Sequence, residues 1–145
     1  MRCRVYTFDF DGTLTTRDTL LLFIRFVCGL WGLISVLVRY APLLVLMKLK
    51  LYPNWRVKQK VFSRCFGGIT IERFNDYCRL FAEKYRCGVL RPDGMEAVRR
   101  ALDEGAVVMI VSASVDNWVR PFFSDIISSS SAQRNLLVLG TQVEA

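Results

Sequence analysis

Three short apolar runs punctuate the chain, each bounded by charged or turn-forming residues. They occupy residues 4–8 (RVYTF), 106–111 (AVVMIV) and 136–139 (LLVL). Runs of about four to eight apolar, often β-branched residues between turn signals are typical of strands in a sheet. The pattern therefore predicts three strands spread along the length of the chain.

Helical periodicity fills the intervals between these runs. Residues 70–86 place apolar side chains three and four positions apart, on one face of a helix. Residues 95–103 predict a short helix that stops before a glycine. Another helix is predicted from Asp116, limited or kinked by Pro121. The polar residues 128–131 predict a loop.

The longest apolar stretch, residues 19–51, follows the first predicted strand closely. We expect two helical pieces there, broken near Ala41 and Pro42, because a proline inside a helix removes a backbone hydrogen bond. Residues 54–64 then predict a basic amphipathic helix. A largely helical insert thus separates the first strand from the second.

The predicted order of elements is strand, helical insert, helix, strand, helix, strand. This alternation is typical of an α/β fold with a parallel, Rossmann-like sheet, here carrying an inserted all-helical cap. We assign residues 1–14 and 91–145 to the α/β core and residues 15–90 to the cap. Ligands of open parallel sheets bind at the carboxyl ends of the strands, so residues that follow strands are the candidates for chemistry.

Composition narrows that chemistry. The chain has 145 residues, 52% of them apolar, which suits one packed domain, or one core with an insert. It contains no histidine, which excludes histidine triads and histidine metal sites. Five cysteines are widely spread without a C-x-x-C pair, which favours reduced, buried thiols over a zinc site or a disulfide framework.

The net charge of +7 is concentrated in one part of the chain. Between Thr19 and Ile71 there is no acidic residue, and the basic residues give that segment a charge of +8: Arg25, Arg39, Lys48, Lys50, Arg56, Lys58, Lys60 and Arg64. Such a segment attracts anions and could steer a phosphate ester toward a site. No nucleic-acid recognition motif accompanies the charge, so we expect no nucleic-acid partner.

Two carboxylates follow the first strand, in Asp9-Phe10-Asp11-Gly12. Residues two apart at a strand end can point the same way, and carboxylate oxygens suit Mg²⁺. Asp9 could attack a phosphoryl group, while Asp11 could protonate the leaving oxygen and then deprotonate water. Gly12 permits a tight turn that brings backbone amides close to a phosphate. The alternative is an ordinary Asx–Gly turn without catalytic function.

Ser112 ends the second predicted strand. Its hydroxyl could donate to a phosphoryl oxygen, and the amides that follow, beginning with Ala113, would open a helix whose N-terminus favours anions. The alternative is that Ser112 or Ser114 only caps this helix. Because the acidic pair ends the preceding strand, we interpret Ser112 as a phosphate ligand and Ser114 as the cap.

Residues 8–15 (FDFDGTLT) resemble the first motif of the haloacid dehalogenase superfamily, and residues 107–112 resemble the second. The layout is similar to the phosphoserine-phosphatase-like branch, in which a helical cap follows the first motif. The resemblance implies that Asp9 is the nucleophile and a Mg²⁺ ligand. It implies that Asp11 is the acid/base and lends its backbone carbonyl to the metal. The phosphate contacts that it implies are Gly12, Thr13, Ser112 and Ala113.

The implied activity is that of a Mg²⁺-dependent phosphatase, which hydrolyses a small or lipid-linked phosphomonoester through an aspartyl-phosphate. The family also uses a lysine and a Gly-Asp-x-x-x-Asp-like acidic cluster, and neither follows Ser112 here. We therefore expect a fragment or prematurely ended copy with little or no turnover, whose first strand is an exposed sheet edge. The alternative is a catalytically inactive truncated relative or a membrane-associated binding protein.

The apolar, basic part of the cap, residues 20–64, raises the question of a membrane. Its longest uncharged run, residues 26–38, has 13 residues, whereas a spanning helix needs about 20, so a clean span is disfavoured. Two interpretations stay open: a packed pair of cap helices, and a helical hairpin held in the membrane interface by its basic residues. We expect a cytoplasmic protein, with or without peripheral membrane contact. No motif identifies the substrate or the oligomeric state.

Overall fold

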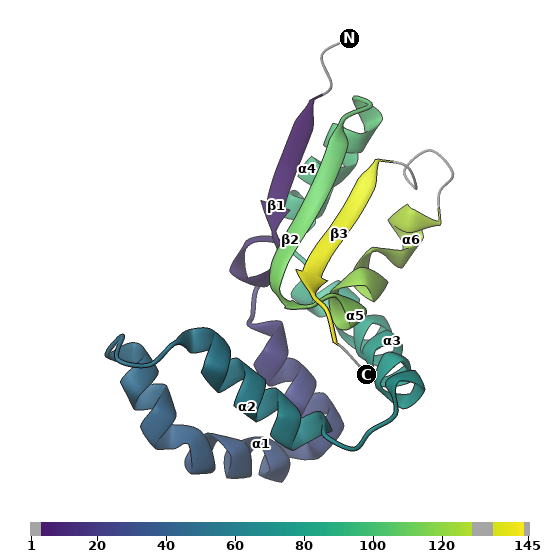
Figure 1. The fold of residues 1–145 in the computed structure, drawn as a ribbon. Coiled ribbons are helices and arrows are strands. Elements are labelled where there is room, and N and C mark those ends of the chain that lie inside the picture. The colour runs from purple at the N-terminus through teal and green to yellow at the C-terminus, as the bar shows by residue number, and fades with distance from the viewer. Residues whose placement is uncertain (1–3, 129–134, 144–145) are drawn as a thin grey trace. The chain divides into compact units, whose positions relative to one another are not determined.

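The computed structural model describes residues 4–128 and 135–143 (Figure 1). The chain divides into two compact units, each described by itself below. The first comprises Met1–Leu20 and Asn75–Ala145, and the second comprises Leu21–Phe74. The second unit lies within the insert of residues 15–90 that the sequence predicts.

The first unit is built on a parallel three-stranded sheet. Its strands are β1 (Val5–Asp9), β2 (Val107–Val115) and β3 (Leu136–Thr141), in the spatial order β1-β2-β3 (Figure 1). All three predicted strands and their parallel arrangement are therefore confirmed, although β2 extends past its predicted end at Val111. Among the described residues β1 has a neighbour on one side only, so it is the predicted edge strand.

Helical segments cover one face of this sheet. The helix α4 (Pro92–Asp103) is the last element before β2, and the short segments α5 (Asp116–Val119), η2 (Arg120–Phe123) and α6 (Ser124–Ile127) join β2 to β3. Both crossovers step in the same direction along the sheet, so right-handed connections place them on the same face, behind the strands in Figure 1. The opposite face keeps Val111, Leu137 and Leu139 exposed among the described residues.

Aromatic side chains fill the space between the sheet and these helices. Phe10 contacts Phe122 and Phe123 edge-on, with ring centroids 5.5 and 5.9 Å apart. Phe81, from the helix α3 (Ile71–Val89), meets Phe122 at 5.6 Å. Burying several aromatic rings in edge-to-face contact contributes more than their area alone. This core fixes Phe10, and through it the turn that carries the acidic pair.

The predicted helices are present, with shifted ends. The predicted segment 70–86 is confirmed as α3, and 95–103 as α4, which begins earlier, at Pro92, because proline suits the first helical turn. The predicted polar loop, residues 128–131, lies outside the described residues from 129 onward. The expectation of buried thiols is right for Cys78 and wrong for Cys87, which is exposed.

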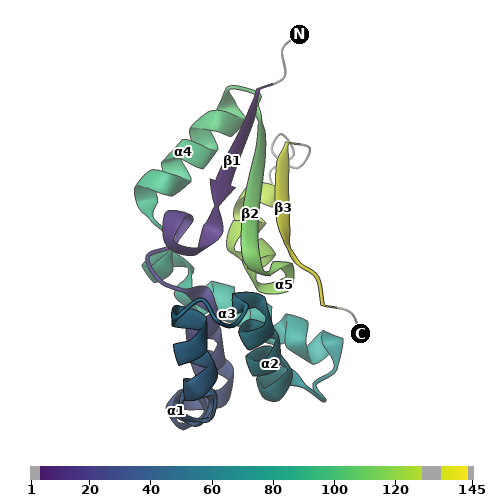
Figure 2. The same ribbon diagram turned by 60° about the vertical axis from the view of Figure 1, so that its left-hand side comes forward.

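The second unit contains most of α1 (Thr19–Lys48) and all of α2 (Asn54–Phe66), drawn in Figures 1 and 2. The predicted break near Ala41 and Pro42 is wrong, because α1 continues through Pro42 and departs from helical geometry at Gly29 instead. Gly29 has φ 73°, a conformation that glycine adopts without the cost other residues incur. Pro42 is exposed, so water can satisfy the carbonyl that loses its partner.

Phenylalanines form the core of this second unit. Phe23 lies against Phe66 and Phe74, with centroids 5.2 and 5.8 Å apart, and Phe62 lies 4.9 Å from Phe66. By length and composition α1 could cross a membrane, a property that buried core helices of soluble proteins share. Within the described chain, 17% of its most apolar 18-residue window is buried.

Candidate active site

Asp9 is the last residue of β1, and its backbone is extended, with φ −76° and ψ 145°. It pairs in register with Val111 of β2, and its side chain is exposed. The hydroxyl of Thr13 donates to Asp9 Oδ2 at 3.3 Å. The predicted position of Asp9, at the carboxyl end of a sheet strand, is therefore confirmed.

A single wide turn, η1 (Phe10–Leu14), carries the rest of the motif. Gly12 has φ 81°, a region where a Cβ would be strained, which explains the glycine after the acidic pair. Its amide donates to Thr15 Oγ1 at 3.1 Å. The buried Thr15 hydroxyl donates to the carbonyls of Phe10 and Arg17, so this one side chain closes the turn from inside.

Asp11 points into the fold and accepts four hydrogen bonds. Thr19 donates twice to Oδ1, from its amide at 3.0 Å and from its hydroxyl at 2.6 Å. Ser112 and Ser114 donate to Oδ2 at 3.2 and 2.6 Å. The carboxylate thus joins the turn after β1, the start of α1 and the end of β2.

The two serines share a face because β2 keeps its alternation of buried and exposed residues through them. Val111 pairs with Leu139 and Val115 pairs with Thr141. Between these two pairs β2 advances by four residues while β3 advances by two, which is a β-bulge in β2. This bulge changes the register between β2 and β3 beyond Val111. Ser112 and Ser114, two apart, both turn inward and are buried, whereas Ala113 between them is exposed.

The predicted cap role of Ser114 is wrong. The residue at the N-cap position of α5 is Val115, which makes no side-chain capping bond, and the Ser114 hydroxyl is directed to Asp11. Ser112 follows the predicted apolar run, but it lies inside β2, which continues to Val115. Its hydroxyl donates to Asp11 and accepts from the Ser114 amide at 3.0 Å. The structure therefore brings Ser112 together with Asp11.

Sequence reasoning missed a supporting layer around Asp11. Thr19 begins α1, and its buried hydroxyl both donates to Asp11 and accepts from the indole N–H of Trp118 at 3.2 Å. Thr15 and Ser114 were likewise not assigned to the site. The spacing Ser112-x-Ser114 carried a usable signal, since residues two apart on a strand share a face. No local sequence pattern indicates the contact between Thr19 and Trp118, because these residues are 99 positions apart.

The sequence is similar to those of known proteins. It matches the family model described as haloacid dehalogenase-like hydrolase over residues 7–135, which is most of the chain. The chain belongs to the haloacid dehalogenase-like hydrolase family. The superfamily that the sequence predicted is thereby confirmed, and its motif residues Asp9 and Ser112 lie inside the matched range.

Relatives of this family member are similar over part of their length. Protein CicA of Caulobacter vibrioides, from two strains, is 33% identical over 115 residues, covering 79% of this chain and 51% of CicA. The chain therefore spans about half the length of these curated relatives. A phosphoserine phosphohydrolase-like protein from Francisella tularensis has a similar fold, with a TM-score of 0.62 and 20% identity, over 94% of this chain and 58% of that one. The predicted α/β fold class with a helical insert is confirmed.

The family implies Mg²⁺, and the described residues do not complete a site for it. No group of three or more histidine, cysteine, aspartate or glutamate side chains suited to a metal occurs in the described part of the chain. Both oxygens of Asp11 are occupied by hydroxyl and amide donors, which leaves the exposed carboxylate of Asp9 as the open ligand of the pair. The metal roles of Asp9 and Asp11 stay predictions.

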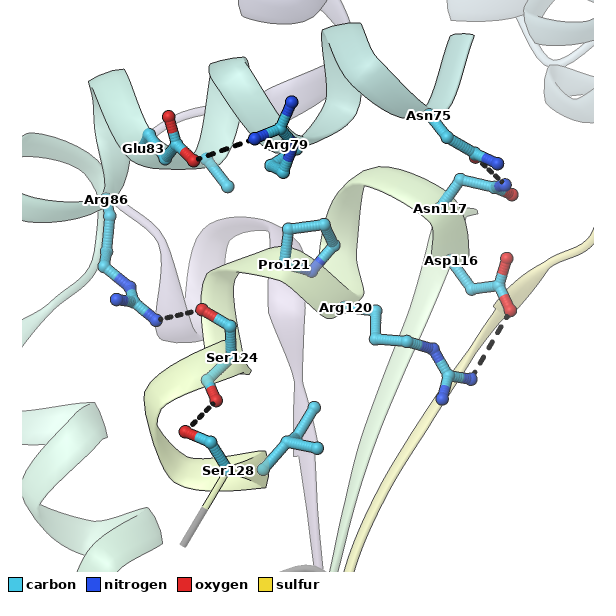
Figure 3. A pocket seen from close by; sticks show the side chains of 12 residues that line it. Asn75, Arg79, Glu83, Arg86, Asp116, Asn117, Arg120, Pro121, Ser124 and Ser128 are labelled. Atoms are coloured by element: carbon cyan, nitrogen blue, oxygen red, sulfur yellow. Dashed lines mark hydrogen bonds and ion pairs between the residues drawn. The ribbon is translucent and has the colours of Figure 1, made fainter. Parts of the chain in front are cut away.

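A pocket of about 700 Å³ lies elsewhere in the first unit, between α3 and the segment α5–α6 (Figure 3). None of the predicted site residues lines it. Arg86 on its wall donates to the carbonyl of Phe122, to Ser124 and to Asp125. The hydrogen bond from Arg86 holds the pKa of Asp125 below its ordinary value. The arginine is thus engaged in joining α3 to α6.

Proposed function

We propose that this chain provides the nucleophile-bearing half of a phosphatase site, in which Asp9 attacks a phosphomonoester. One observation carries the proposal: Asp9 stands exposed at the carboxyl end of β1, where a substrate can reach its carboxylate. Among the described residues, the Asp9 carboxylate accepts a side-chain hydrogen bond from the Thr13 hydroxyl, and the distance between the two oxygens is a long 3.3 Å. A carboxylate held this loosely keeps an oxygen free for nucleophilic attack.

The proposed reaction has two displacements at phosphorus. In the first, an Asp9 oxygen bonds to phosphorus, the bond to the leaving alcohol breaks, and the alcohol oxygen takes a proton. In the second, water attacks the aspartyl-phosphate, gives up a proton, and releases inorganic phosphate with the Asp9 carboxylate restored. Splitting hydrolysis in this way replaces one difficult step with two easier ones.

Asp11 is the proposed proton carrier for both steps. A protonated carboxyl presents an O–H that needs an acceptor, and here four donors converge on the two oxygens. The hydroxyls of Ser112, Ser114 and Thr19 can reverse their role, because a hydroxyl both donates and accepts. Rotation of one hydroxyl would therefore let Asp11 hold or release a proton without leaving its place.

Phosphate contacts are proposed at Gly12, Thr13, Ser112 and Ala113, which lie near the carboxyl ends of β1 and β2. The Gly12 amide donates to Thr15, and the Ser112 hydroxyl donates to Asp11, so both would have to exchange partners when phosphate binds. Mg²⁺ is proposed as the cofactor from the family resemblance and would need oxygen ligands besides Asp9. The proposed substrate is a small or lipid-linked phosphate, met in the cytoplasm.

A second candidate is a binding protein without turnover. The observation in its favour is that no three metal-binding side chains gather in the part of the chain that the structure describes. A phosphoryl-transfer site without charge neutralisation stabilises its transition state poorly. Binding of a phosphate ester without hydrolysis would then be the outcome.

The test uses p-nitrophenyl phosphate and the purified chain, with Mg²⁺ or with EDTA. An Asp9→Asn variant should lose hydrolysis and lose any acid-stable phosphate label on the protein. The matched control is Asp93→Asn, an exposed carboxylate in the first turn of α4. Hydrolysis that survives in Asp9→Asn would refute the proposed nucleophile, and a folded wild-type chain that binds phosphate esters without hydrolysis would favour the second candidate. The rates of hydrolysis with Mg²⁺ and with EDTA are compared to test the role of Mg²⁺ separately.

A further inference from the structure

An apolar stripe runs along the exposed side of α1 beyond Gly29. Leu30, Ile34, Val38 and Val45 are all exposed, and they recur at multiples of three and four residues, which places them on one helix face. Trp31 stands beside this stripe and is 82% exposed. Large exposed apolar surfaces of this kind mark binding sites on soluble proteins.

The other side of the same helix is already used. Leu33, Val36, Leu43 and Met47 recur with the same helical spacing and are half-buried. The aromatic core of the unit is formed by other residues, among them Phe23 and those of α2 and α3. The exposed stripe is therefore not used for packing within the second unit.

The charge of this unit indicates the chemistry of that partner. From Thr19 to Ile71 there is no acidic residue, and all but one of the eight basic residues are exposed; Lys58 alone is half-buried. Two aromatic residues, one just before α2 and one in its first turn, stand among them. Arg56 lies over the Trp55 ring at 5.1 Å, and Lys60 lies over the Tyr52 ring at 5.6 Å. Trp55 is exposed and Tyr52 is half-buried; aromatic rings beside basic residues suit the headgroup level of a bilayer.

We propose that the unit Leu21–Phe74 binds the surface of a bilayer that contains anionic lipid. The apolar stripe of α1 lies in the interface between headgroups and acyl chains, and the basic residues of α1 and α2 face the lipid phosphates. An interfacial position fits better than a span, because the longest uncharged run has 13 residues and Arg39 is exposed beside the stripe. The proposal does not depend on catalysis by Asp9.

Two independent attractions are expected to act together. Apolar side chains entering the interface give binding that persists at high salt, whereas attraction to anionic lipid weakens as salt screens the charges. A protein partner would have to be both strongly apolar and strongly acidic to match the same surface. A bilayer with anionic headgroups offers both properties at once.

The experiment is flotation of the full 145-residue chain with vesicles of phosphatidylcholine, alone or with about a third phosphatidylglycerol. We expect recovery with the anionic vesicles to exceed recovery with the neutral ones about tenfold, and to fall with added salt. The tryptophan emission should shift to the blue on binding, and the shift should shrink in Trp31→Phe. Equal recovery from both vesicles, or no recovery from either, would overturn the proposal.

Two pairs of variants separate specific binding from general stickiness. Trp31→Ser with Val38→Ser should lower vesicle recovery about tenfold, whereas Leu80→Ser with Leu139→Ser, exposed positions of the first unit, should leave it unchanged. Lys60→Glu with Arg64→Glu should abolish the preference for anionic lipid, and Lys84→Glu with Arg99→Glu should preserve it. Circular dichroism verifies that each variant is folded.

The remaining outcomes identify other occupants and would contradict the proposal. A stable dimer that the Trp31→Ser and Val38→Ser changes dissociate would show that a second copy covers the stripe. Vesicle-bound chain that alkaline carbonate does not release, and that proteolysis cuts on both sides of the bilayer, would show a spanning helix. Release by carbonate together with loss of binding in the stripe variant supports the interfacial arrangement.

Discussion

Ser114 Oγ donates a 2.6 Å hydrogen bond to Asp11 Oδ2 across 103 positions of the chain. The bond ties the turn after β1 to the irregular end of β2. Ser112 donates to the same oxygen, and its hydroxyl also accepts a hydrogen bond from the Ser114 amide. The two serines are therefore linked to each other and hold the Asp11 carboxylate together. The position of the candidate acid/base is thereby set by β2 as well as by its own turn.

Replacing Ser114 by alanine should destabilise the chain. The variant loses a buried hydrogen bond to a carboxylate, so we expect the free energy of unfolding to fall by about 1.5–3 kcal/mol. Urea denaturation followed by circular dichroism measures it. Ser63→Ala, at an exposed position of α2, is the control and should change the midpoint little. Equal midpoints for the two variants would show that the hydrogen bond contributes nothing.

Replacing Gly12 by alanine should also destabilise, for a reason of backbone geometry. Its φ of 81° is costly for a residue with a Cβ, and a Cβ there would meet no atom within 4 Å, so strain is the whole effect. We expect a loss of about 1–2 kcal/mol. Gly88→Ala is the matched control, because Gly88 lies within α3 at negative φ with the same open space. It should stabilise by about 0.5–1 kcal/mol; a gain in both variants would contradict the argument.

Much of the fold follows from local patterns. The three strands are apolar runs between turn residues, and α3 and α4 carry apolar residues at helical spacing, so each is visible in a short window of sequence. Asp9 and Ser112 were predictable for the same reason, since each follows such a run. Gly12 was predictable because the turn after a strand needs a residue that tolerates positive φ.

What the sequence could not supply depends on contacts between distant segments. Ser114 looked like a helix cap because the predicted strand ended at Val111. In the structure β2 continues to Val115, and Ser114 donates to Asp11, 103 positions away. Pro42 looked like a helix break, but at an exposed position its missing hydrogen bond costs less than in a core, and Gly29 bends the helix instead. The partnership of Thr19 with Trp118 likewise arises from packing alone.

The described thiols should differ strongly in reactivity. Cys87 is exposed, whereas burial and the nearby Asp116 raise the pKa of Cys78 to about 12. Only a thiolate reacts readily with maleimide, so at neutral pH Cys87 should be modified early and Cys78 only after unfolding. Peptide mass spectrometry after timed labelling distinguishes the two. Cys78 labelled as fast as Cys87 in the native chain would contradict the burial of α3 against the core.

The ion pair of Arg86 with Asp125 should make stability depend on pH. The hydrogen bond from Arg86 lowers the pKa of Asp125 in the folded chain, so the folded state favours the charged carboxylate more than the unfolded state does. Its contribution is present above the ordinary aspartate pKa of about 3.9 and is lost as the pH falls through the lower folded value. Asp125→Asn should therefore be less stable than wild type near neutral pH, with the difference closing in stronger acid.

The measurement is urea unfolding of both proteins across that acid range, repeated in an Arg86→Gln background. Because Asp125 is exposed at the surface, solvent screens the pair and the difference should be small. Arg86 also donates to the Phe122 carbonyl, so its loss destabilises by itself, and the double-mutant cycle removes that part. In the Arg86→Gln background the pH-dependent effect of Asp125→Asn should shrink to the small part that comes from the charge of Arg99. A difference that widens in acid, or that survives undiminished without Arg86, would place the cause elsewhere than in this pair.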